Sequence, residues 1–260
     1  MSKESTTWMS ERLGQELTLV RWGEVGVPLL IFASAGGDAE EIERFYLVDA
    51  IGEYLAAGQV KVYSVDSLAG RHWFTEDRTT RGGAAVQQRF DAALYHEVLP
   101  AIRQDCGDES IEIVTSGASV GAYNALAFLC RHPEACSAAI CMSGTYGLEK
   151  FLRGPVTPEL YEISPLHFVP DLEEDGEQLR RLRQRFVLLA HGEGEAESPE
   201  EDWKVANTLG RRGIPNRVDN WGPDYKHDWP TWRAMLPRYV GELLAQPAAA
   251  GDESATAEEE

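Results

Sequence analysis

Long apolar runs and paired cysteines are both missing from this sequence of 260 residues. No apolar run reaches the ~18 residues that a membrane-spanning helix needs, and the N-terminal segment has no apolar stretch of the signal-peptide type. The four cysteines, Cys106, Cys130, Cys136 and Cys141, form no CxxC pair and have no histidine at zinc-site spacing. We therefore expect a cytoplasmic protein with neither a disulfide framework nor a structural metal.

Basic residues are also in short supply. The chain has 24 Lys and Arg against 43 Asp and Glu, a formal net charge of −19. Such a surface repels phosphate backbones and anionic lipid headgroups, so we expect neither nucleic acid nor membrane as a partner. The last nine residues, DESATAEEE, hold five acids and no base. We interpret the excess acid as a solubility feature and predict an acidic disordered tail over 246–260.

The remaining sequence alternates short apolar runs with longer amphipathic ones, the pattern of β-α-β units. We interpret seven runs as strands: Leu17–Trp22, Pro28–Ala33, Val60–Val65, Ile111–Thr115, Ala138–Met142, Phe186–Ala190 and Arg217–Asn220. The helical stretches between them are Ala39–Ala57, Gly83–Gln104, Val120–Arg131, Pro199–Arg212 and Pro230–Leu244. This order predicts a single doubly wound α/β domain over 1–245, with a mostly parallel sheet, helices on both faces and an insertion at about 151–185 over one end of the sheet.

The segment Gly117-Ala118-Ser119-Val120-Gly121 matches G-x-S-x-G and lies between an apolar strand and a helix. This is the setting of a nucleophile elbow, in which the two glycines are needed because a side chain at either position would collide with the neighbouring strand or helix. The alternative interpretation is an ordinary strand-to-helix turn in which Ser119 caps the helix. The context favours Ser119 as a nucleophile, placed where the helix N-terminus stabilises developing negative charge.

A serine nucleophile needs a base. In the fold that uses this elbow, the chain order is nucleophile, acid, histidine. His227 lies in the loop between the last predicted strand and the last predicted helix, where that fold places its base. We predict His227 as the base and keep His191, at the end of a strand, in reserve.

The acid is expected in the loop after the strand Phe186–Ala190, which offers six carboxylates: Glu193, Glu195, Glu197, Glu200, Glu201 and Asp202. The oxyanion of the reaction needs backbone N–H donors. We predict the N–H of Val120 as one donor and that of Ala35 or Gly36, in a loop of small residues after an early strand, as the other. No metal or cofactor is suggested.

Four segments of the chain resemble the putative esterase family of the esterase D type, within the α/β-hydrolase superfamily. They are the small-residue loop 34–37, the Val-Asp-Ser at 65–67, the GASVG elbow and, most specific, WGPDYKHDWPTWR at 221–233. The resemblance covers about 17–239 and implies an α/β-hydrolase fold, with Ser119 as nucleophile and His227 as base. The family loop G-x-G-x-W-E corresponds to 192–197, which implies Glu197 as the acid, with Glu195 next. Ala196 replaces the tryptophan of that loop.

We therefore expect a serine esterase that hydrolyses small-molecule carboxylic esters through an acyl-enzyme. An acyltransferase of the same fold is one alternative, since the resemblance extends to mycolyl-type transferases. A binding module that has the fold but no activity is another, suggested by the altered acid loop.

Overall fold

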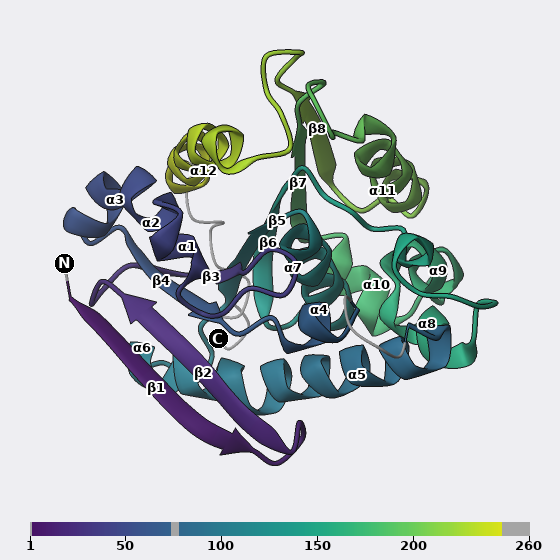
Figure 1. Cartoon of the computed structure of the whole chain (residues 1–260), viewed down its shortest axis with the longest axis horizontal. Coiled ribbons are helices and arrows are strands. Elements are labelled where there is room, and N and C mark those ends of the chain that lie inside the picture. The colour runs from purple at the N-terminus through teal and green to yellow at the C-terminus, as the bar shows by residue number, and fades with distance from the viewer. Residues whose placement is uncertain (1, 74–77, 246–260) are drawn as a thin grey trace, which may run out of the picture.

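The computed structural model describes residues 2–73 and 78–245, which form one twisted eight-stranded sheet with helices packed against it (Figure 1). The strands are β1 (Lys3–Ser10), β2 (Gln15–Trp22), β3 (Val27–Phe32), β4 (Val60–Val65), β5 (Ile113–Ala118), β6 (Cys136–Met142), β7 (Phe186–His191) and β8 (Asn216–Asn220). The central strands are buried on both faces and rich in Val, Ile and Leu, as the near-continuous apolar runs predict.

The strand order is β1-β2-β4-β3-β5-β6-β7-β8. β1 pairs with β2 and β2 with β4 in antiparallel fashion, whereas β3 to β8 all run parallel. The carboxyl ends of β3, β5, β6, β7 and β8 therefore meet at one edge of the sheet. Loops that leave these five ends can bring residues far apart in the sequence to a single place.

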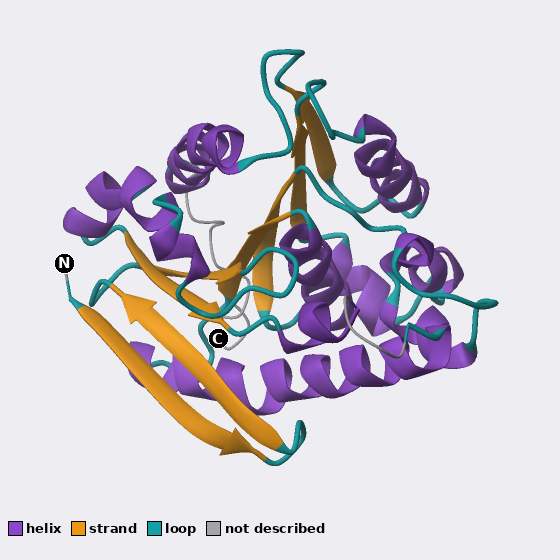
Figure 2. Cartoon of the chain, viewed as in Figure 1, coloured by secondary structure: helices purple, strands orange, loops and turns teal. Residues whose placement is uncertain are grey.

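Helices cover both faces of the sheet, as Figure 2 shows. The α-helices are α1 (Glu41–Arg44), α2 (Leu47–Ala50), α3 (Gly52–Ala56), α4 (Leu68–Trp73), α5 (Thr80–Ala93), α6 (Leu99–Cys106), α7 (Val120–Arg131), α8 (Pro158–Ile163), α9 (Pro165–Phe168), α10 (Glu177–Leu182), α11 (Pro199–Arg211) and α12 (Trp229–Leu244). One core packs α1, α2, α3 and α12 on one face, and a larger core packs α4 to α11 on the other. The predicted layered α/β arrangement is thereby confirmed.

The structure adds the short helix α4, Leu68–Trp73, which was not predicted, and it differs from the predicted elements in three further places. β1 is an additional strand, missed because Lys3–Ser10 is a largely exposed edge strand without an apolar face. The predicted helix Ala39–Ala57 is three short helices, since Tyr46 adopts a left-handed φ of 61° and the backbone leaves helical geometry again at Ile51. The predicted helix Gly83–Gln104 is interrupted by a π-helical turn, Leu94–Val98, just before Pro100, which lacks the N–H needed to continue a regular ladder.

The predicted insertion at about 151–185 holds α8, α9 and α10 together with a short 3-10 turn, Val169–Asp171. A further 3-10 turn, Leu148–Lys150, precedes it. The predicted tail over 246–260 lies outside the described residues. Within the parts that are described, no helix combines the length and the apolarity that crossing a bilayer requires.

Candidate active site

Ser119 forms a sharp turn between β5 and α7. Its backbone has a φ of 57° and a ψ of −120°, a conformation that residues other than glycine rarely adopt. A Cβ at Gly117 would overlap the backbone of Gly121, and a Cβ at Gly121 would lie 2.6 Å from the carbonyl oxygen of Phe32. The two glycines of G-x-S-x-G therefore allow the strand and the helix to approach closely enough to hold the strained turn.

The Ser119 hydroxyl does not cap α7. Instead its Oγ lies 3.0 Å from Nε2 of His227, a residue of the loop between β8 and α12. The His227 side chain is 22% exposed, so its ring is sheltered and still accessible. A hydrogen bond from the His227 N–H to the carbonyl oxygen of Glu195, at 3.1 Å, fixes the histidine loop against the loop that follows β7. The structure thus brings together the predicted nucleophile and the predicted base.

The second imidazole nitrogen of His227 faces Glu197. Nδ1 lies 3.8 Å from Oε2, beyond hydrogen-bond length but within ion-pair range, and the Glu197 side chain is only 1% exposed. The other oxygen, Oε1, accepts a hydrogen bond of 2.6 Å from the hydroxyl of Ser143. Ser143 in turn accepts one of 3.0 Å from the indole N–H of Trp232. Serine, imidazole and carboxylate therefore lie in one row, supported behind the carboxylate.

The loop that carries Glu197 packs directly on the histidine loop. The Gly194 N–H donates to the carbonyl oxygen of Tyr225 at 2.9 Å, and a Cβ at Gly192 would overlap that same oxygen. Ala196, where the family loop has tryptophan, adopts a left-handed φ of 64°. This conformation directs the chain so that the next residue, Glu197, is buried beside His227.

The reserve acid, Glu195, is directed elsewhere. Its side chain is 80% exposed and forms an ion pair of 3.2 Å with Lys226. Glu193 likewise accepts a hydrogen bond from the Asn220 amide at 2.6 Å. Among the six candidate carboxylates, the contacts of the described residues place Glu197 alone against His227.

The first turn of α11 holds three more of the candidates, among them Glu201. Glu201 accepts hydrogen bonds from the N–H groups of Tyr146 and Gly147 at 2.9 and 2.8 Å. Burial acts to raise the Glu201 pKa, but these two N–H groups and the Lys150 ammonium outweigh it and lower the pKa of this carboxyl. Glu201 therefore anchors, as an anion, the loop that follows β6.

His191, the reserve base, is paired with a carboxylate of its own. Its Nδ1 lies 2.9 Å from Oδ2 of Asp202, and both side chains are 1% exposed. Burial raises the pKa of the Asp202 carboxyl, while the hydrogen bond from His191 opposes that rise. His191 is thus committed to a buried pair, and His227 occupies the position against Ser119.

The predicted oxyanion donors also lie near the elbow. Val120 is the first residue of α7, directly after Ser119. Ala35 and Gly36 follow β3, whose carboxyl end touches the first turn of α7 through the close approach of Phe32 and Gly121. Ala35 adopts a left-handed φ of 41°, a strained conformation in this loop of small residues.

Sequence reasoning did not assign a role to Ser143 or to the indole of Trp232. Ser143 is the residue after β6, and a polar side chain at the carboxyl end of a central parallel strand is the signal that points to this edge. Trp232 belongs to the HDWPTWR segment, where the pattern alone indicates only core packing.

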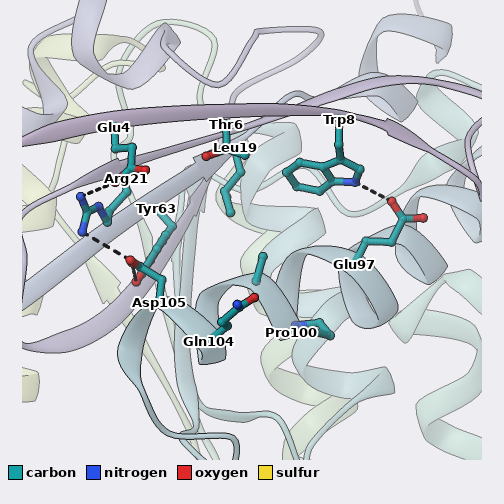
Figure 3. A pocket seen from close by; sticks show the side chains of 11 residues that line it. Glu4, Thr6, Trp8, Leu19, Arg21, Tyr63, Glu97, Pro100, Gln104 and Asp105 are labelled. Atoms are coloured by element: carbon teal, nitrogen blue, oxygen red, sulfur yellow. Dashed lines mark hydrogen bonds and ion pairs between the residues drawn. The ribbon is translucent and has the colours of Figure 1, made fainter.

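A cavity of about 610 Å³ lies between the β1–β2 hairpin and α6 (Figure 3). Its charged side chains have partners: Arg21 forms ion pairs with Glu4 and Asp105, and Glu97 accepts a hydrogen bond from the Trp8 indole N–H. None of its lining residues belongs to the serine–histidine–carboxylate row. No cluster of three or more His, Cys, Asp or Glu side chains suited to a metal ion occurs among residues 2–73 and 78–245.

Comparison with known proteins identifies the family and the fold. A family model described as "Esterase: Putative esterase" matches residues 55–243. Among solved structures, a ferulic acid esterase is similar over 94% of this chain and 97% of its own, with a TM-score of 0.71 and 16% identity. No curated protein sequence matches the chain significantly.

Two further solved structures have the same fold. An S-formylglutathione hydrolase from Agrobacterium tumefaciens is similar over 93% of this chain and 94% of its own, with a TM-score of 0.68 and 14% identity. A fluorophosphonate-binding serine hydrolase from Staphylococcus aureus, solved with substrate bound, is similar over 94% of this chain and 99% of its own, with a TM-score of 0.66 and 14% identity. The predicted α/β-hydrolase fold is confirmed by these similarities.

Proposed function

Because the chain belongs to the putative esterase family and is an esterase, we propose that Ser119, His227 and Glu197 form a catalytic triad that hydrolyses small-molecule carboxylic esters through an acyl-enzyme. The observation that carries the proposal is the row of contacts from Ser119 Oγ to His227 Nε2, at 3.0 Å, and from His227 Nδ1 to Glu197, at 3.8 Å. A hydroxyl within hydrogen-bond reach of an imidazole, which in turn faces a buried carboxylate, is the arrangement that activates a serine.

In the first half of the reaction, Ser119 Oγ attacks the ester carbonyl carbon while its proton passes to His227 Nε2. The tetrahedral intermediate collapses when the bond between the carbonyl carbon and the alkoxy oxygen breaks. His227 returns the proton to that oxygen, and the alcohol leaves. The acyl group remains on Ser119 as an ester.

In the second half, a water molecule takes the place of the alcohol. The water oxygen attacks the acyl carbon while His227 accepts a proton from the water. The bond between the acyl carbon and Ser119 Oγ then breaks as His227 returns the proton to the serine. The carboxylic acid leaves and the enzyme is restored. In both halves of the reaction the proton is accepted and returned by Nε2 of His227.

Glu197 acts on the imidazole rather than on the substrate. Its negative charge stabilises the imidazolium that forms in each half, and its position favours the tautomer with the proton on Nδ1. Its other oxygen is already bonded to Ser143, so the carboxylate is held in place while the charge develops.

Negative charge on the carbonyl oxygen requires donors that are in position before the reaction. The Val120 N–H at the start of α7 supplies one, assisted by the positive end of the helix dipole. The loop of Ala35 and Gly36 supplies the other.

Hydrolysis of a series of p-nitrophenyl acyl esters, from short to long chains, tests this proposal. We expect turnover by the wild-type protein and a loss of at least about 10³-fold in kcat for Ser119→Ala. Ser110→Ala, at an exposed turn serine remote from the site, is the matched control and should retain full activity. Turnover by Ser119→Ala equal to that of the wild type would overturn the proposal.

A further inference from the structure

Three successive carbonyl groups after β3 are all held by the segment that begins α4. The Ala35 carbonyl oxygen accepts a hydrogen bond from the Ser67 hydroxyl at 2.7 Å. The Gly36 oxygen accepts one from Arg71 Nε at 3.0 Å, and the Gly37 oxygen accepts one from the Ser67 N–H at 2.9 Å. The loop proposed to offer an oxyanion donor is therefore held by hydrogen bonds from Ser67 and Arg71 to its carbonyl oxygens.

The contact between this loop and α4 leaves no free space. A Cβ at Gly70 would overlap the Ala35 carbonyl oxygen and would lie 2.5 Å from Ser67 Oγ. A Cβ at Gly36 would lie 2.9 Å from Cγ of Arg71. Glycine is thus required on both sides, and any movement of α4 is transmitted to the loop.

Arg71 is itself anchored to the sheet. One of its terminal nitrogens donates to Oδ1 of Asp66 at 3.1 Å, although the side chain is 43% exposed. The same oxygen accepts the Ala39 N–H at 3.2 Å, and Oδ2 accepts the Thr18 N–H at 3.0 Å. We call Asp66, Ser67 and Arg71 the carbonyl clamp.

Because the peptide unit is planar and trans, holding the Ala35 carbonyl also fixes the direction of the Gly36 N–H. The C=O of Ala35 and the N–H of Gly36 belong to one peptide unit and point in opposite directions. With the carbonyl held toward α4, the Gly36 N–H points away from it. The Gly37 N–H is already bonded to the Ser34 carbonyl oxygen at 2.9 Å, so it is not the free donor.

We propose that Ser67 and Arg71 are positioning residues for ester hydrolysis: Ser67 holds the Ala35 carbonyl, which orients the Gly36 N–H as the second oxyanion donor, and Arg71 holds the next peptide unit through the Gly36 carbonyl. This inference rests on the proposed function. The left-handed φ of Ala35 gives the clamp a physical role, because a strained residue relaxes when the contacts that hold it are removed.

Ser67→Ala removes the donor to the Ala35 carbonyl. We expect kcat to fall about tenfold with little change in KM, since a misplaced donor loses part of the ~10²–10³-fold effect of a complete donor. Gly70→Ala, which displaces the same carbonyl by its bulk, should have a larger effect in the same direction. The matched control is Ser64→Ala on β4: Ser64 is also fully buried, but its hydroxyl has no hydrogen-bond partner among the described residues.

A trifluoromethyl ketone inhibitor distinguishes a positioning role from a merely structural one. Its adduct with Ser119 carries an oxyanion, so its inhibition constant should rise by the same factor by which kcat/KM falls in Ser67→Ala and Gly70→Ala. The pH dependence of kcat/KM should keep its wild-type shape, because His227 and Glu197 are untouched.

The outcomes separate this inference from the proposed function. Unchanged kcat and unchanged inhibition in folded Ser67→Ala and Gly70→Ala, beside an active wild type that depends on Ser119, would overturn the clamp alone. A fall in kcat without weaker inhibitor binding would also overturn it, since the oxyanion would then be unaffected. A wild type without Ser119-dependent turnover would overturn both proposals.

Discussion

The Ser143 hydroxyl donates to Glu197 Oε1 at 2.6 Å, on the side of the carboxylate opposite His227. Glu197 is thus held more tightly by a residue outside the proposed triad than by its imidazole partner, which lies 3.8 Å from Oε2. A carboxylate fixed in this way is in place before any positive charge develops on the imidazole.

Replacing Glu197 by Gln should lower kcat by about 10²–10⁴-fold, because a neutral amide can stabilise the wrong imidazole tautomer and cannot stabilise the cation. Glu195→Gln is a matched control, since this carboxylate is exposed and bonded to Lys226. Kinetics on a p-nitrophenyl ester for both variants check the prediction. A larger loss of kcat in Glu195→Gln than in Glu197→Gln would show that Glu197 is not the acid.

Replacing Ser143 by Ala removes the donor to Glu197 and leaves the Trp232 indole N–H without its acceptor. We expect kcat to fall about tenfold and the free energy of unfolding to fall by about 1–3 kcal/mol, the cost of an unpaired buried polar group. Steady-state kinetics and urea unfolding measure the two effects. Ser137→Ala on β6, the strand that precedes Ser143, is the control: its hydroxyl makes only a 3.5 Å contact with the Ile113 carbonyl oxygen, and the change should alter neither quantity.

The buried pair of His191 and Asp202 predicts a pH dependence of stability. Burial raises the Asp202 pKa above its ordinary value of 3.8. The folded state therefore binds this proton more tightly than the unfolded state, and this carboxyl lowers stability as the pH rises through the interval between the two pKa values.

Asp202→Asn removes that titration and keeps an oxygen for His191. The difference in unfolding free energy, wild type minus variant, should become less favourable to the wild type as the pH is raised from 4. Urea unfolding across pH 4–7 provides the measurement. A difference that is constant, or that changes in the opposite direction, would show that burial of Asp202 does not raise its pKa.

The elbow predicts a contrast between two helical glycines. Gly121→Ala places a methyl group 2.6 Å from the Phe32 carbonyl oxygen and should cost about 1–3 kcal/mol of stability, together with activity. At Gly52, in α3, an added Cβ has no atom of the described residues within 4 Å, so Gly52→Ala should be neutral or slightly stabilising. Thermal unfolding of the two variants compares them, and equal melting temperatures would contradict the prediction.

Local chemistry explains which parts of the site were predictable. Ser119 is marked by two glycines whose need is visible within five residues, and His227 by a distinctive loop at the expected place in the chain order. The acid was harder, because six carboxylates follow β7 within a short stretch. Packing against the histidine loop and the left-handed Ala196 bring Glu197, the acid we propose, beside His227, and neither feature is encoded in spacing.

The same reasoning applies to the fold. The central strands can be predicted from continuous apolar runs, because burial on both faces requires apolar residues along the whole strand. β1 has no such requirement, because it is an edge strand whose side chains are mostly exposed. The interruption at Tyr46 depends on a backbone conformation that helical periodicity does not report.

The order β4-β3-β5 has a consequence for where a substrate can be held. After β3 the chain moves to one side to form β4, and it later returns to the other side of β3 to form β5. The helices that follow β3 and β5 pack on opposite faces, so the loops leave the sheet in opposite directions. This is a topological switch point. The distance between the loops that follow β3 and β5 is set by the hydrogen-bonded pairing of these two strands at the centre of the sheet.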